Sequence, residues 1–311
     1  MSDDAERRLM ISMVNQRRKR TQARIDRRLR EGRGKGEGSD YKPYLSIRDV
    51  PSIGRSHRDI DLSGGRTTHY LSDLEYRFAA IACWLLPVRD LREQYPLPLE
   101  ETRAIATACG YPHTRDPRTK EDDVATTDIL LTLETPDGSR DLACSIKHSQ
   151  ELGGARTLEK LEIERRWWTR RGVPWVLVTE QEISQPLADN ILNLRHYYRV
   201  DDRLSLTDEI LAVLIDELSH IIARQDMPLS HAAFDCDERL GQPPGTSLTI
   251  AYHLLATRRW HTDLRQLLDP SRPLKLLPSP VPTPFTPTAP APNIPRIEDD
   301  TSPSECATRA G

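Results

Sequence analysis

The chain has 311 residues, which is enough for about two domains of ordinary size together with tails. Its 44 lysines and arginines nearly balance its 47 aspartates and glutamates, so the net charge of −3 excludes a protein that is basic over its whole surface. The N-terminus has no apolar signal segment, no run of 18 apolar residues occurs, and the five cysteines show no CxxC spacing. We therefore expect a cytoplasmic protein without membrane contacts, disulfide framework or zinc site.

Residues 1–40 form a polar segment that is dense in arginine. Its few apolar residues support at most a short helix and no core, so we expect a basic, flexible arm. Two interpretations stay open: a solvated terminus, or an arm that contacts the phosphates of DNA. The side chains that would make such contacts are Arg17, Arg18, Lys19, Arg20, Arg27 and Arg28.

The rest of the chain divides into three parts by pattern. Residues 41–183 mix helical and strand patterns and predict an α/β core, whereas residues 184–270 have mainly helical periodicity. The seam falls where the strand pattern stops, at Ser184-Gln185-Pro186. Residues 271–311 are rich in proline, which predicts an extended, disordered tail.

Two neighbouring strands carry the first candidate residues. "TTDILLTL" (residues 126–133) and "DLACSIKH" (141–148) flank "ETPDGSR", a strong hairpin signal. If Asp137 and Gly138 form the loop, Asp128 faces Lys147 and supplies the counter-charge that a buried lysine needs. A three-residue turn that includes Pro136 would separate the two side chains unless a bulge restores the contact. An ordinary cross-strand ion pair is the alternative interpretation.

Two glutamates on predicted helices add to this pair. Glu75 lies in the first turn of a helix predicted from about Ser72 to Pro87, where Ser72-x-x-Glu75 also matches a capping box. Glu164 lies toward the apolar side of the helix in "TLEKLEIERRWW". That helix ends near Gly172, and "WVLVT" then predicts a buried strand.

The resulting order is a helix with Glu75, a strand with Asp128, a strand with Ser145-x-Lys147, a helix and a strand. This order is typical of the restriction-endonuclease fold. Carboxylates hold a hard cation such as magnesium, which neutralises charge on a scissile phosphate, and a lysine can orient or acidify the attacking water. We expect magnesium as the cofactor, with manganese able to substitute.

At this point the sequence resembles the TnsA family, the endonuclease subunit of heteromeric transposases. The resemblance covers most of residues 40–270 and rests on "LSDLEYRF", "LREQYPL", "TTDILLT", "SIKHSQEL", "EKLEIERRWW" and "GVPWVLVTEQEI". It implies an endonuclease domain with a restriction-endonuclease-like fold, here residues 41–183. It also implies a winged-helix-like C-terminal domain, here residues 184–270.

The resemblance also implies residue roles. Glu75 and Asp128 match the metal-binding acids of the family, Lys147 its catalytic lysine, and Glu164 a further acid near the metals. Ser145 departs from the usual Gln or Glu, and a serine hydroxyl is a weaker and shorter ligand. The backbone carbonyl of Ile146 is the alternative ligand at that point.

The implied reaction is hydrolysis of one phosphodiester at the 5′ side of each transposon end. A TnsB-like transposase would cut the 3′ side, and a TnsC-like AAA+ ATPase would license both cuts. Two alternatives remain: a stand-alone restriction or repair nuclease of the same fold, and a non-catalytic adaptor. We expect residues 184–270 and the tail to bind protein partners, because the tail has few basic residues, and the N-terminal arm to bind DNA.

Overall fold

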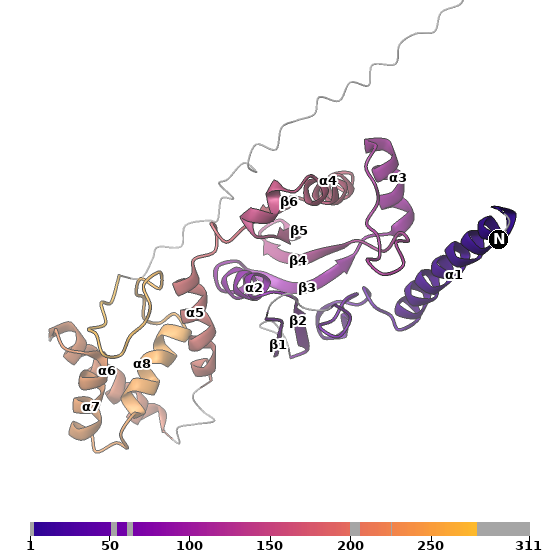
Figure 1. Cartoon of the computed structure of the whole chain (residues 1–311). Helices are drawn as coiled ribbons and strands as arrows, with labels where there is room; N and C mark the ends of the chain where they lie inside the picture. Colours follow the sequence, from indigo (N-terminus) through magenta and orange to yellow (C-terminus); the bar gives the residue numbers. More distant parts are fainter. Residues whose placement is uncertain (1–2, 51–54, 61–64, 200–205, 225, 279–311) are drawn as a thin grey trace, which may run out of the picture.

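The computed structural model describes residues 3–50, 55–60, 65–199, 206–224 and 226–278. Its centre is a four-stranded sheet with the spatial order β3–β4–β5–β6 (Figure 1). Strands β3, β4 and β5 pair antiparallel, and β6 runs parallel to β5. The strands are β3 (Val88–Pro96), β4 (Thr126–Thr135), β5 (Gly138–Ile146) and β6 (Trp175–Val178).

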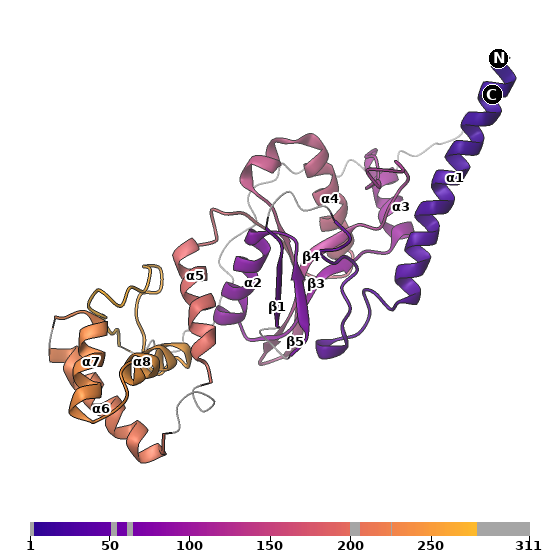
Figure 2. The ribbon, with the colours of Figure 1, turned by 60° about the horizontal axis from the view of Figure 1, so that its bottom comes forward.

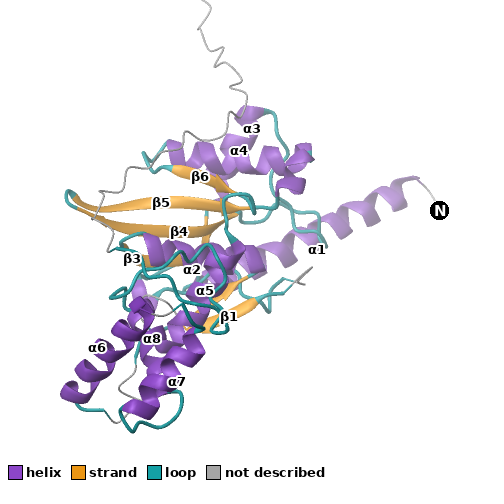
Figure 3. Cartoon of the chain, turned by 90° about the vertical axis from the view of Figure 1, so that its left-hand side faces the viewer, coloured by secondary structure: helices purple, strands orange, loops and turns teal. Residues whose placement is uncertain are grey.

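Helices cover both faces of this sheet (Figure 3). On one face α2 (Asp73–Leu85) packs on Ile129 and Leu131 of β4. On the other face α3 (Leu99–Cys109) and α4 (Ala155–Thr169) pack on Leu130. Successive strand residues point to opposite faces, and both faces of β4 are buried, which explains its nearly continuous apolar run.

The N-terminal segment is not the flexible arm that we expected. Residues Asp3–Arg30 form one helix, α1, which projects from the sheet domain at the end opposite the C-terminal helices (Figures 1 and 2). Its last turns are packed, with Ile25 and Arg28 each 4% exposed. Arg28 donates to Asp49 at 3.1 Å and lies over the ring of Tyr44, so its side chain is engaged within the fold instead of facing solvent as a DNA contact would.

The C-terminal part is mainly helical, as predicted. Its core lies between three helices and includes Leu218, Ala233 and Ile250. Among the described residues of this part, strand pairing is limited to the isolated bridge between His261 and Leu277, and the winged-helix-like arrangement stays a prediction. The helices of this part are α5 (Gln185–Leu194), α6 (Asp208–Arg224), α7 (Leu229–Arg239) and α8 (Thr246–Ala256).

The predicted tail begins later than expected. Residues 271–278 are bound to the helical domain, because the backbone N–H of Leu229 donates to the Arg272 carbonyl at 3.0 Å and that of Leu277 to the His261 carbonyl at 2.7 Å. The prediction of disorder for the remaining residues, 279–311, lies outside the described residues.

A small hairpin joins the two parts. It consists of β1 (His57–Ile60) and β2 (Thr67–Tyr70), and Asp59 of β1 accepts a hydrogen bond from Arg195 Nη2 at 3.1 Å. Three short 3₁₀ helices complete the secondary structure of the described residues: η1 (Gly38–Asp40), η2 (Ser149–Gly153) and η3 (Arg195–Tyr197). Among the helices described, none combines the length and the apolar character that a bilayer crossing requires.

Candidate active site

The β4–β5 hairpin has a different register from the one that we favoured. Thr135 pairs with Gly138, so the loop is Pro136-Asp137 rather than Asp137-Gly138. Gly138 adopts a φ of 111°, which glycine tolerates and other residues rarely do. As a result Ile129 faces Cys144 instead of Ile146. A shift of two residues leaves every side chain on its predicted face, although Lys147 is no longer opposite Asp128.

Asp128 and Lys147 nevertheless make the predicted contact, along a diagonal. Lys147 Nζ lies 2.8 Å from Asp128 Oδ2, and the backbone N–H of Ile146 donates to the same oxygen at 2.8 Å. Burial by itself would lower the pKa of Lys147, but the charge and hydrogen bond of Asp128, together with the charges of Glu75 and Glu164, raise that pKa overall. Lys147 is therefore held as an ammonium ion, with Asp128 as its main counter-charge.

Glu75 combines the two functions that its sequence position suggested. Its backbone N–H donates to Ser72 Oγ at 3.1 Å, and its Oε2 accepts from the Leu71 N–H at 2.9 Å, so it serves the start of α2. The side chain is also buried beside the site, with 5% of its surface exposed. Burial, and then the negative charge of Asp128, raise the pKa of Glu75 to about 7. Glu75 thus both caps the start of α2 and lies close enough to Asp128 to feel its charge.

Glu164 reaches the site from α4 on the opposite face of the sheet. It is 8% exposed, and its Oε1 accepts a hydrogen bond from Ser145 Oγ at 2.6 Å. Burial, followed by the charge of Asp128, raises the pKa of Glu164 to about 7. Ser145 Oγ also accepts from Trp175 Nε1 at 3.2 Å. The hydroxyl of Ser145 therefore orients Glu164 in this arrangement, rather than facing an open position.

Sequence reasoning missed Gln94, which lies in β3 at the level of Asp128. Its neighbours Glu93 and Tyr95 pair with Ile129 and Thr127 of β4. Gln94 is 2% exposed, has a φ of 50°, and its Nε2 lies 3.4 Å from Glu75 Oε2. A left-handed residue other than glycine persists only where its surroundings hold it, and no sequence pattern indicates such a residue.

Lys160 is the second residue that the sequence analysis passed over. It precedes Glu164 by four residues on α4, so the two side chains share one face of the helix. Burial, Arg156 and Lys147 lower the pKa of Lys160, which indicates that the ammonium groups of Lys160 and Lys147 are close enough to repel each other. Its spacing from Glu164 was the signal that could have revealed it.

The three acids have the donor chemistry of a hard divalent cation. Glu75, Asp128 and Glu164 are all buried, and the charge of Asp128 raises the pKa of both glutamates. One ammonium group cannot neutralise three ionised carboxylates, and oxygen donors suit magnesium. As placed, no three His, Cys, Asp or Glu side chains in the described ranges stand close enough to hold one ion. Glu75 and Glu164 are instead turned toward hydrogen-bond donors of their own.

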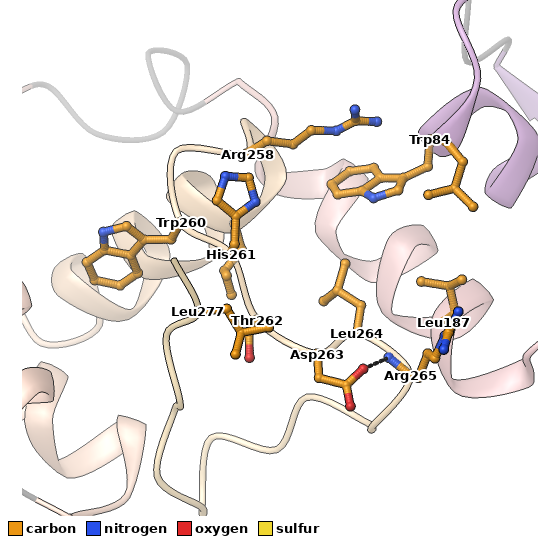
Figure 4. A pocket seen from close by; sticks show the side chains of 12 residues that line it. Trp84, Leu187, Arg258, Trp260, His261, Thr262, Asp263, Leu264, Arg265 and Leu277 are labelled. Atoms are coloured by element: carbon orange, nitrogen blue, oxygen red, sulfur yellow. Dashed lines mark hydrogen bonds between the residues drawn. The ribbon is translucent and has the colours of Figure 1, made fainter. Parts of the chain in front are cut away.

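A pocket of about 430 Å³ lies elsewhere, between α2 and the C-terminal helices (Figure 4). Trp84 and Trp260 line it, and Arg258 lies over the Trp84 ring at 4.7 Å. Its one acidic lining residue, Asp263, accepts a hydrogen bond from the backbone N–H of Arg265. The pocket thus lacks the several carboxylates that would hold a metal ion for phosphodiester hydrolysis. The candidate site remains the acid cluster, by which we mean Glu75, Asp128 and Glu164.

Comparisons with known proteins agree with the two-part organisation. Residues 87–180 match the family model described as "TnsA-like endonuclease N terminal", and residues 182–264 match "TnsA endonuclease C terminal". The chain is also 39% identical over 213 residues to "Transposon Tn7 transposition protein TnsA" of Escherichia coli, a match that covers 68% of this chain and 70% of that protein.

Proposed function

This chain belongs to the TnsA family of endonucleases, and we propose on that premise that it cleaves DNA at transposon ends in a metal-dependent reaction. The family and the fold class inferred from the sequence are confirmed: a restriction-endonuclease-like mixed sheet is followed by a helical C-terminal region. The observation that carries the proposal is the approach of three side chains to Asp128 of β4: Glu75 from α2, Glu164 from α4, and Lys147 from the residue directly after β5.

The proposed metal site consists of Asp128, Glu75 and Glu164, with the Ile146 carbonyl as a further oxygen donor. Magnesium, or manganese in its place, would lower the charge on the phosphate under attack. Ser145 would hold Glu164 in position through its 2.6 Å hydrogen bond. Gln94 would do the same for Glu75 through its side-chain amide.

Lys147 acts in this proposal as a cation rather than as a base. Its pKa is raised by Asp128, so it carries its proton at neutral pH. If Asp128 turns to hold a metal, the ammonium group loses its main counter-charge and can orient the attacking water or the phosphate. Lys160, on the same side of α4 as Glu164, would contact a phosphate of the bound strand.

We also propose the place of this subunit in transposition. The cut would fall at the 5′ side of each transposon end, with a TnsB-like transposase cutting the 3′ side and a TnsC-like AAA+ ATPase licensing both. The relative from Escherichia coli is itself named as a transposition protein, which supports this assignment. Exposed apolar side chains on α6 and α7, namely Val213 and Phe234, support protein binding by the C-terminal helices.

The test is cleavage of a transposon-end duplex that carries a different label on each strand. The full chain is incubated with magnesium, manganese or a chelator, with and without the partner transposase and the ATPase. We expect this chain to add a nick at the 5′ side of the transposon end, beside the partner's cut at the 3′ side, and to do so only with metal and with the partners. Cleavage of unrelated DNA by the chain alone would favour a stand-alone nuclease. Strand-specific products that are unchanged when Asp128 and Lys147 are both replaced by alanine would favour the adaptor.

A further inference from the structure

We infer that α1 is a rigid arm that binds the phosphate backbone of DNA outside the cleavage site. The inference rests on the proposed function only in that duplex DNA is the substrate. The arm itself is argued from how the basic residues of α1 divide. In the last turns Arg24 and Arg28 form ion pairs with aspartates from later parts of the chain, whereas the run of four cations at residues 17–20 forms none with the described side chains.

The first anchor of α1 is a buried set of polar contacts with the loop that precedes β4. Arg24 forms ion pairs with Asp116 and with Asp123, the latter at 2.7 Å, and Thr21 Oγ1 lies 2.6 Å from Thr119 Oγ1. Burial by itself would raise the pKa of Asp116, but Arg24 and two backbone N–H groups lower it to about 2. Such pairs persist because breaking one would leave a charge buried without compensation.

The second anchor lies one helical turn further on. Asp49 accepts hydrogen bonds from Arg28 at 3.1 Å and from Arg33 at 2.7 Å, and the Arg28 guanidinium lies 5.0 Å from the centre of the Tyr44 ring. The charges of Arg28 and Arg33 are therefore both compensated by the carboxylate of Asp49. The anchors fix α1 along its last turns and leave the preceding part projecting (Figure 2).

The projecting part carries the uncompensated charge. Arg17, Arg18, Lys19 and Arg20 are all exposed, and none of them has an acidic partner among the side chains that the structure describes. Arg27 differs, because Glu31 lies 3.6 Å from it. Four adjacent cations on about 6 Å of helix form a local basic site on a chain whose net charge is negative. Successive side chains point about 100° apart, so a duplex on one side meets two or three of them.

The anchors also connect the arm to the acid cluster. Asp123 precedes Asp128 by five residues, and the backbone N–H of Tyr44 donates to the Gln94 carbonyl at 3.2 Å. Gln94 in turn contacts Glu75. The arm is thus fixed on the segments that carry the site. From residue 3 to residue 20 it extends about 27 Å, so it meets phosphates well away from the cut.

The experiment compares two full-length variants that lose the same charge. In the first, Arg17, Arg18, Lys19 and Arg20 are replaced by glutamine; in the control, Arg224, Arg259, Arg265 and Lys275 are replaced, which are exposed at the opposite end of the molecule. Binding to a 40-base-pair and a 10-base-pair duplex is measured by fluorescence anisotropy in chelator, so no cleavage occurs. Each titration is repeated over a range of salt concentrations, with and without the partner transposase. Circular dichroism verifies that α1 remains helical.

We expect the first variant to lose about two to three units from the slope of log K against log salt on the long duplex, because each phosphate contact contributes about 0.9. The short duplex and the control variant should show little change. A third variant, Arg24→Gln, keeps the exposed charges but loosens the anchor, and it should lose part of the same slope. Equal slopes for the first variant and the wild type would overturn the inference and leave the proposed function standing.

Two further outcomes are decisive. If the first variant binds DNA normally but no longer binds the partner transposase, α1 is a protein-docking helix and the inference is wrong. If the wild type binds no DNA in any condition, with or without that transposase, the proposed function fails together with the inference.

Discussion

Asp128 and Lys147 are joined by a 2.8 Å ion pair although they are not opposite each other in their hairpin. The diagonal contact arises because the loop closes at Pro136-Asp137 and the lysine follows the last residue of β5. It leaves Asp128 accepting two hydrogen bonds at one oxygen, from Lys147 and from the Ile146 N–H. The counter-charge of the lysine is thus the residue that we place at the centre of the metal site.

Replacing Asp128 should abolish cleavage without unfolding the protein. Asp128→Asn keeps an oxygen for the Ile146 N–H but removes the charge that a metal needs, and Asp128→Ala removes both. We expect neither variant to cut transposon-end DNA at any magnesium concentration. Asp137→Asn, in the exposed loop of the same hairpin, is the matched control and should cut normally. Undiminished cutting by Asp128→Ala would place the metal elsewhere.

Replacing Lys147 should separate chemistry from metal binding. Lys147→Ala leaves the three carboxylates in place and removes the cation that we propose orients the attacking water or the phosphate. We therefore expect the cleavage rate to fall by about 100-fold or more. Manganese binding, measured by electron paramagnetic resonance, should be retained or strengthened, because Asp128 loses a competing positive charge. Loss of manganese binding together with activity would show that Lys147 is needed only to build the site.

The pKa values of Glu75 and Glu164 predict a pH dependence of stability in metal-free protein. Both lie at about 7 in the folded state against 4.5 for an ordinary glutamate. Between those values the folded state binds more protons than the unfolded state, so the free energy of unfolding falls as the pH rises. Chemical denaturation at a series of pH values should show this fall. Glu75→Gln and Glu164→Gln should each make the free energy of unfolding less dependent on pH. An unchanged pH dependence in both variants would contradict the raised pKa values of these two glutamates.

Ser145 should act through Glu164 rather than on the metal. Ser145→Ala removes the hydrogen bond to Glu164 Oε1 but leaves all three carboxylates, so we expect a higher magnesium requirement with a nearly normal rate at saturation. The measurement is the cleavage rate as a function of magnesium concentration. Ser139→Ala, on the exposed part of β5, serves as the control. A loss of activity that magnesium cannot restore would make Ser145 part of the reaction itself.

Lys160 should contribute to DNA affinity and little to the chemical step. For Lys160→Ala we expect KM for DNA to rise several-fold and the salt slope to fall by about one, with kcat almost unchanged. Arg170→Ala removes an exposed cation just past the end of α4, about 15 Å along the axis, and should leave both quantities unchanged. If the two substitutions had equal effects, Lys160 would contribute to DNA affinity only as one of many surface charges and not through a contact of its own.

Periodicity predicted the elements that carry the site. The helix with Glu75, the strand with Asp128, the strand that leads into Lys147 and the helix with Glu164 occur as α2, β4, β5 and α4. Each has one or two strongly apolar faces, which is the signal that sequence periodicity measures. Strand β3 gave no such signal, because Arg92, Glu93 and Gln94 follow one another in it and are buried all the same.

The other differences depend on contacts between residues far apart in the chain. The sequence of the arm predicts a flexible segment because its partners, Asp49, Asp116 and Asp123, lie well beyond it in the sequence. Burial of Arg28 follows from the same cause. The hairpin register depended on which residue adopts a positive φ, and a two-residue difference leaves the facing pattern unchanged. Local pattern therefore identified the residues of the site but not their exact partners.

The most direct test of the central claim is to locate the metal. Crystals of the full chain soaked in manganese should show an anomalous scattering peak about 2 Å from carboxylate oxygens of Asp128 and Glu75, with Glu164 close by. The peak should vanish in Asp128→Asn crystals treated in the same way. A manganese peak bound by other residues, in protein that cleaves transposon-end DNA with manganese, would contradict the account.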